Sequence, residues 1–193
     1  MTFRPSILGA AVALVSSLAF AQTVGQPEHF TANAVSTSPQ YGTGQQIIDI
    51  NVTRWSTPAE RDALVAALTS KGQDQLLKAL QKMKQTGTIR TPDSLGYPLR
   101  YAFQTPDPEG GRTIVIATDR PISFWEATNQ PRSFDYPFTV IQMHIDRDGT
   151  GKGTMSYATR ITAKNNTIEL EDFATQPIML NNIKAEPAKV GKG

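Results

Sequence analysis

The chain has 193 residues, no cysteine and a formal net charge of +2 at pH 7. The absence of cysteine excludes disulfides, zinc–thiolate and iron–sulfur sites and a thiol nucleophile. The nearly neutral charge gives no electrostatic basis for binding nucleic acid, so we expect no nucleic-acid partner, and no motif indicates a cofactor.

The first predicted element is a signal peptide over residues 1–21. A single arginine precedes a run of apolar and small residues, as in an export signal. Ala19 and Ala21 occupy the small positions of an A-x-A cleavage site, so we expect the mature chain to begin at Gln22. The apolar run is shorter than the roughly 20 residues of a membrane-spanning helix. We therefore expect a periplasmic or extracellular protein with no integral membrane segment after cleavage.

Cleavage leaves 172 of the 193 residues, which is enough for one hydrophobic core. We predict a single β-rich domain over residues 22–186 and a disordered tail over 187–193. The leader holds one of the 19 basic residues and none of the 17 acidic ones, so the mature chain has a net charge of +1.

Two strands and a helical hairpin are predicted in the first half of the domain. Apolar and polar residues alternate over 30–35 and again over 48–53, which predicts two half-buried strands. Thr57-Pro-Ala-Glu60 is a capping box with proline at the first helical position. It opens a helical hairpin at about 57–85.

Glycines are expected to end both helices of this hairpin, Gly72 the first and Gly87 the second. Apolar side chains recur at helical spacing along both helices. Neither helix is stable alone, so the apolar stripes must pack on a sheet or on each other. The residues predicted to be buried there are Leu64, Leu68, Leu76, Leu80 and Met83.

From residue 88 onward the pattern predicts strands joined by turns. Alternation over 99–103 predicts one strand, and residues 106–111 are expected to form a hairpin loop. Ile114 and Ile116 belong to the next predicted strand, and residues 122–137 form a longer connection. Alternation over 139–145 predicts a strand with one buried face and one solvent face. Further strands are expected near 155–161, 168–170 and 178–180.

These elements predict a mainly β fold of the α+β kind. We expect an antiparallel meander of eight to nine strands that forms a barrel or a strongly bent sheet, with one inserted helical hairpin. Strands in hairpin succession pair with their neighbours, and a long sheet hides its edges by curling.

The segment 146–153 resembles the start of a calcium-binding loop. Oxygen-bearing side chains stand at positions one, three and five, with glycine at position six. Position twelve, however, is Tyr157, where a bidentate glutamate is required. We therefore expect a solvent-exposed hairpin loop with positive φ at its glycines, Gly149, Gly151 and Gly153.

His144, Asp146 and Asp148 share one face of an extended strand. Such a set either binds a divalent metal or provides the solvent face of the strand. We favour the solvent face and predict no metal site. The acidic residues over 169–172 either supply carboxylates for acid–base chemistry or form a solvated strand face, and we favour the solvated face.

Aromatic residues gather between 97 and 138, where they would line the mouth of a barrel or fill its core. The chain lacks the common catalytic motifs, such as G-x-S-x-G and H-E-x-x-H. The leading hypothesis is therefore a non-enzymatic protein that binds a small apolar ligand or associates with the envelope. The candidate ligand-binding residues are Tyr101, Phe103, Arg120, Trp125 and Tyr136.

Two alternatives remain open. One is a hydrolase or isomerase, and the other is a purely structural or interaction domain. Arg120 either pairs with its neighbour Asp119 or binds a ligand anion. The enzymatic site would be assembled from Asp119, Arg120, Glu126, Asp135 and His144.

Three segments of the chain resemble parts of small exported bacterial proteins of unassigned function: residues 54–57, 117–126 and 135–138. The resemblance covers most of the mature chain. It implies export and a single domain, and it carries no activity, cofactor or site residue.

Overall fold

The computed structural model describes residues 25–37, 43–92, 96–108, 110–119, 138–158, 160–164, 167–171 and 177–188. The predicted signal peptide, with Ala19, Ala21 and Gln22, lies outside these residues. So do three of the candidate ligand-binding residues, Arg120, Trp125 and Tyr136.

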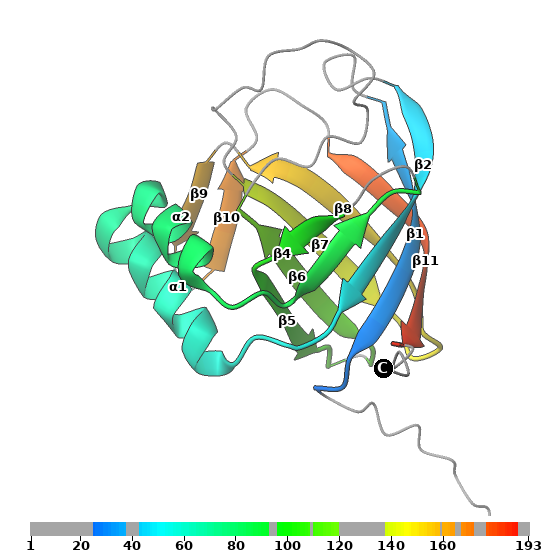
Figure 1. Cartoon of the computed structure of the whole chain (residues 1–193), viewed down its shortest axis with the longest axis horizontal. Helices are drawn as coiled ribbons and strands as arrows, with labels where there is room; N and C mark the ends of the chain where they lie inside the picture. The colour runs from blue at the N-terminus through cyan, green and yellow to red at the C-terminus, as the bar shows by residue number, and fades with distance from the viewer. Residues whose placement is uncertain are drawn as a thin grey trace, which may run out of the picture.

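Nine antiparallel strands form one sheet that curls into a nearly closed barrel (Figure 1), which confirms the predicted fold class. They are β1 (Glu28–Ser36), β2 (Gly44–Val52), β3 (Gly87–Arg90), β4 (Tyr97–Leu99), β5 (Tyr101–Pro106), β6 (Arg112–Thr118), β7 (Phe138–Ile145), β8 (Thr150–Ala158) and β11 (Ile178–Pro187). Their order across the sheet is β4-β3-β2-β1-β11-β8-β7-β6-β5. Two further strands, β9 (Arg160–Lys164) and β10 (Thr167–Glu171), form a separate antiparallel ribbon.

One bent segment, β4 followed by β5, closes the barrel. β4 pairs with β3 at one edge of the sheet, and β5 pairs with β6 at the other edge. Only Arg100 separates the two strands, and its backbone N–H donates to the Ala117 carbonyl at 2.9 Å. The chain therefore passes from one edge of the sheet to the other within one residue.

The prediction of a single strand over 99–103 is wrong for this reason. Leu99 and Ala102 both point into the barrel, whereas Tyr101 lies on its outer surface. A regular strand would place Leu99 and Tyr101 on the same face. The change of partner at Arg100 shifts the alternation by one residue.

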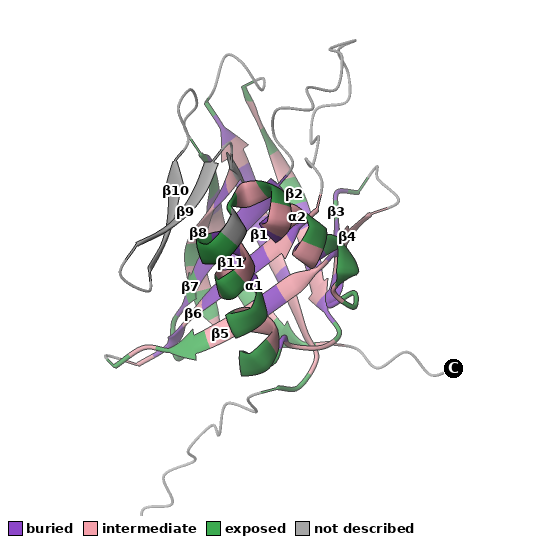
Figure 2. Cartoon of the chain, turned by 90° about the vertical axis from the view of Figure 1, so that its left-hand side faces the viewer, coloured by how far each residue is buried: buried purple, intermediate pink, exposed green. Residues whose placement is uncertain are grey.

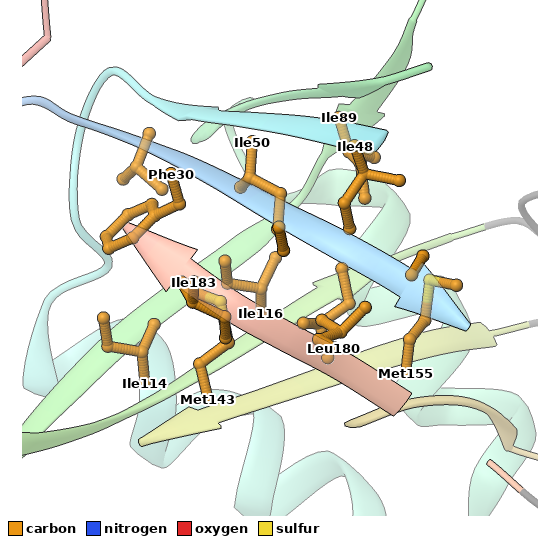
Figure 3. Close-up of a cluster of buried hydrophobic side chains, with 14 of the residues drawn as sticks. Phe30, Ile48, Ile50, Ile89, Ile114, Ile116, Met143, Met155, Leu180 and Ile183 are labelled. Atoms are coloured by element: carbon orange, nitrogen blue, oxygen red, sulfur yellow. The ribbon is translucent and has the colours of Figure 1, made fainter. Parts of the chain in front are cut away.

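Apolar side chains fill the barrel interior (Figure 3). They come from both halves of the wall, and those of β6 and β7 lie opposite those of β1 and β11. Close packing of this kind excludes water and ligands from the centre. The ten labelled residues are all 0% exposed: Phe30, Ile48, Ile50, Ile89, Ile114, Ile116, Met143, Met155, Leu180 and Ile183.

An ion pair crosses one end of the barrel. Arg112 on β6 donates through both terminal nitrogens to the carboxylate of Glu28 on β1, with Nη1 2.7 Å from Oε1. Arg112 Nη1 also donates to Gln104 Oε1 at 2.7 Å. β1 and β6 are not neighbours in the sheet, so the pair ties opposite walls together.

The helical hairpin consists of α1 (Pro58–Lys71) and α2 (Gln73–Lys82). The capping box is confirmed, because Thr57 Oγ1 accepts from the backbone N–H of Glu60 at 3.2 Å and the Glu60 carboxylate accepts from that of Thr57 at 2.8 Å. Gly72 ends α1 as predicted, with a φ of 75°. No helix among the described residues is long and apolar enough to cross a membrane.

The prediction that Gly87 ends the second helix is wrong. α2 ends at Lys82, and Gly87 is the first residue of β3. A Cβ at Gly87 would lie 2.0 Å from the carbonyl oxygen of Asn51 on β2. The glycine is therefore required by the close approach of two strands.

The turn between β7 and β8 is exposed, as predicted, but shorter than the predicted loop over 146–153, because β8 begins at Thr150. Gly149 has the expected positive φ, 83°. The same prediction is wrong for Gly151 and Gly153, which lie within β8 without a positive φ. A Cβ at these positions would lie 2.1 and 2.4 Å from carbonyl oxygens of β7, so both glycines permit close strand packing.

Candidate functional site

The helical hairpin covers part of the outer surface of the barrel (Figures 1 and 2). Leucines of both helices pack against Phe138 and Val140 of β7. This confirms the predicted burial of Leu64, Leu68, Leu76 and Leu80, which are 2–8% exposed, while Met83 is half-buried beside them. β9 lies against both helices.

The prediction that β7 has one solvent face is wrong for the first half of the strand. Phe138 and Val140 are 1% and 8% exposed on the outer face because the hairpin lies over them. Beyond the hairpin, Gln142 and His144 on the same face are exposed as predicted.

A small apolar pocket, called here the hairpin pocket, lies between the helices and the outer face of the barrel. Its volume is about 60 Å³. A cavity of roughly 150 Å³ accepts a benzene ring, so the hairpin pocket suits a short alkyl group better than a ring. It is lined by Arg61, Leu64, Val65, Leu68, Leu76, Leu80, Tyr101, Ala117, Phe138 and Val140.

Two of the predicted ligand-binding residues lie at this site. Tyr101 lines the pocket, and its ring is stacked on Phe103 with a centroid distance of 6.2 Å. Both lie on the outer surface and not at a barrel mouth. Burial raises the pKa of Tyr101 to about 12, so the hydroxyl is neutral near pH 7.

Arg61 lies beside these two rings. Its guanidinium carbon is 5.6 Å from the centroid of the Phe103 ring, within the range of a cation–π contact. This contact places a positive charge at an otherwise apolar pocket.

A second arginine, Arg54, fixes both ends of the hairpin to the barrel. Its Nη1 and Nη2 donate to the Glu60 carboxylate at 3.0 and 2.9 Å. It also donates to the carbonyls of Lys84 and Gln85, which follow α2. The hydrogen bond from Arg54 is the main cause that lowers the pKa of Glu60, while burial opposes it.

The predicted carboxylate–histidine site is not brought together in the described part of the chain. His144 is paired with Thr113 in the β6–β7 ladder. Asp119 lies six residues beyond Thr113 along the chain. At about 3.4 Å per residue of a strand, this places Asp119 roughly 20 Å from His144. Arg120, Glu126 and Asp135 lie outside the described residues.

Each of the two described members has other partners. Asp119 Oδ2 lies 3.4 Å from Arg100 Nε at the bend between β4 and β5. His144 lies between two carboxylates, with Nδ1 3.6 Å from Asp107 Oδ2 and Nε2 3.4 Å from Asp146 Oδ1. These contacts give them structural roles at opposite ends of the sheet.

Asp148, the third member of the candidate metal set, is engaged within its own turn. Its Oδ1 accepts from the backbone N–H and the hydroxyl of Thr150 at 2.9 and 2.8 Å. The backbone hydrogen bond is the main cause that lowers the pKa of Asp148. Within the described ranges, no three His, Asp or Glu side chains are placed to hold a metal ion. The side chains of 169–172 lie outside the described set.

Comparison of the chain with protein-family models, curated proteins and solved structures found no match.

Sequence reasoning missed three residues of the hairpin pocket, Arg61, Ala117 and Val140, whereas Phe138 belongs to the predicted aromatic set. One signal for them was available. From Phe138 to Ile141 the chain reads Phe-Thr-Val-Ile, with apolar residues on both faces of the strand. A strand with this pattern is covered on both sides, which points to the helical hairpin as the outer cover.

Proposed function

We propose that the protein is an exported, non-enzymatic binding protein that holds a small apolar ligand in the hairpin pocket. The observation that carries the proposal is the pocket itself, in which nine of ten lining residues are uncharged and mostly apolar. Concave, apolar sites with few polar groups are typical of small-molecule binding. Side chains fill the interior of the described barrel. A wider groove between the exposed faces of α1 and α2, lined by Ala66, Ser70 and Lys78, is open and half polar, so the hairpin pocket is the more enclosed and more apolar of the two.

The location of the protein forms part of the same proposal. Residues 1–21 have the pattern of an export signal. This pattern supports a role in the periplasm or outside the cell.

The pocket limits what apolar contact alone contributes. A buried CH₂ group contributes about 0.8 kcal/mol, so a chain of about three carbons gains roughly 2.4 kcal/mol. A Kd of 1 mM requires about 4.1 kcal/mol. A ligand of this size must therefore also make a polar contact.

Saturation-transfer NMR with butanol tests the pocket directly. Ala117→Leu places a larger side chain in the hairpin pocket, so we expect the butanol signal to fall strongly. Ile47→Leu, at a residue 56% exposed on β2, is the matched control and should keep it. Equal signals in both variants would contradict the proposal.

A structural or interaction domain is the second candidate, and the filled interior favours it. The butanol experiment distinguishes this second candidate from a ligand-binding protein. If the unmodified protein shows no transfer to butanol, while its circular dichroism shows a folded protein, the hairpin pocket is only a packing defect and this second candidate is preferred.

A further inference from the structure

Among the ten described residues that line the hairpin pocket, only Arg61 carries a charge. Its side chain is 39% exposed, so the guanidinium lies between the apolar interior of the pocket and solvent. The pocket is therefore amphipathic, with an apolar floor and a cationic rim.

The guanidinium of Arg61 has capacity for a further partner. Its ion-pair partner within the described residues is Asp62, with Nη1 3.7 Å from Oδ1, which is beyond hydrogen-bond distance. Asp62 is 73% exposed, and exposed pairs of this kind contribute little. Arginine has five N–H donors in a planar fork that matches a carboxylate.

The charge selects among possible head groups. A carboxylate accepts charge-assisted hydrogen bonds from a guanidinium, and these are about twice as strong as neutral ones. An alcohol makes only a neutral contact. An ammonium group accepts no hydrogen bond from the guanidinium, and Asp62, 3.7 Å from Arg61 and 73% exposed, offsets only part of the repulsion. The pocket volume of about 60 Å³ limits the apolar part to a short chain.

From these observations we infer that the ligand is a short aliphatic carboxylate, with its carboxylate on Arg61 and its alkyl chain among the leucines of α1 and α2. The inference rests on the proposed function, because it specifies the ligand class of the same pocket. Neither the apolar floor nor the cationic rim alone selects this class.

Three probes of equal chain length test the inference: butyrate, butanol and butylamine. Their affinities are measured by NMR titration of the protein at constant ionic strength and pH 7. We expect butyrate to bind about tenfold more tightly than butanol, because one charge-assisted hydrogen bond contributes roughly that difference in affinity. Butylamine should bind most weakly.

Arg61→Gln should reduce the affinity for butyrate about tenfold and that for butanol much less, because only butyrate loses a charge-assisted contact. Arg90→Gln is the matched control, because Arg90 is 63% exposed on β3 and does not line the pocket. It removes the same charge and should leave butyrate binding unchanged.

The outcomes separate the two proposals. Equal binding of butyrate and butanol, or an equal loss with Arg90→Gln, would overturn the carboxylate inference and leave the pocket as a binding site. Absence of binding by all three probes would overturn the proposed function together with the inference.

Discussion

The ion pair across the end of the barrel predicts a strong asymmetry between single and double substitutions. The side chains of Arg112 and Glu28 are 10% and 13% exposed, so the pair is largely removed from water. Arg112→Met leaves the Glu28 carboxylate buried without its cation, which should cost about 3–5 kcal/mol. Glu28→Leu combined with Arg112→Met removes both charges and should be close to neutral.

Urea unfolding followed by tryptophan fluorescence measures both effects. With an m-value of about 2 kcal/mol/M, Arg112→Met should lower the midpoint by roughly 1.5–2.5 M. Arg90→Met, at an exposed arginine, should change stability by less than about 0.5 kcal/mol. A loss below about 1 kcal/mol for Arg112→Met, or a double variant as unstable as the single one, would refute the reasoning.

Three further predictions concern the hairpin and its supports. Leu80→Ala, at a residue 2% exposed, should cost about 2–5 kcal/mol in urea unfolding; a loss below about 0.5 kcal/mol would mean that the hairpin does not pack on the sheet. Gly87→Ala should cost more than about 1 kcal/mol, because its Cβ would lie 2.0 Å from the Asn51 carbonyl oxygen, and an alanine variant of normal stability would contradict this close approach. The pKa of Glu60 is lowered by Arg54, so its ion pair contributes fully above the unfolded pKa of about 4.3 and is lost as pH falls through the lowered value. The stability difference between the unmodified protein and Glu60→Gln should therefore be constant from about pH 5 to 8 and shrink below about pH 4.3; no change on acidification would contradict it.

Local sequence signals predicted most of the elements correctly. The capping box at Thr57 and Glu60 needs only side chains three residues apart to satisfy helix-end N–H groups. The strands near Phe30 and Ile50 have one buried face, so their period of two is visible in the sequence. In each case, the neighbours along the chain carry the information.

The change of strand partner at Arg100, between β4 and β5, was not visible in the sequence. Leu99 is covered by the barrel core and Tyr101 by the hairpin, so both are apolar although they point in opposite directions. Periodicity detects a change from apolar to polar surroundings. It cannot detect a strand that changes partners while both faces stay covered.

The hairpin pocket depends on contacts between segments far apart in the chain. The leucine spacing predicted that α1 and α2 bury a face, but not which surface receives it. That surface is the outer side of β5, β6 and β7, through Tyr101, Ala117 and Val140. The sequence also suggested a site at the barrel mouth, whereas isoleucines and other large side chains fill the interior.

The central claim is that a ligand binds outside the barrel, under the hairpin. Methyl-resolved NMR of the protein labelled at isoleucine, leucine and valine tests it most directly, with butyrate as the titrant. We predict shifts at Leu64, Leu68, Leu76, Leu80 and Val140, with no shift at the interior residues Ile48, Ile116 and Leu180. Shifts at the interior methyls, or none at the five pocket residues, would contradict the claim.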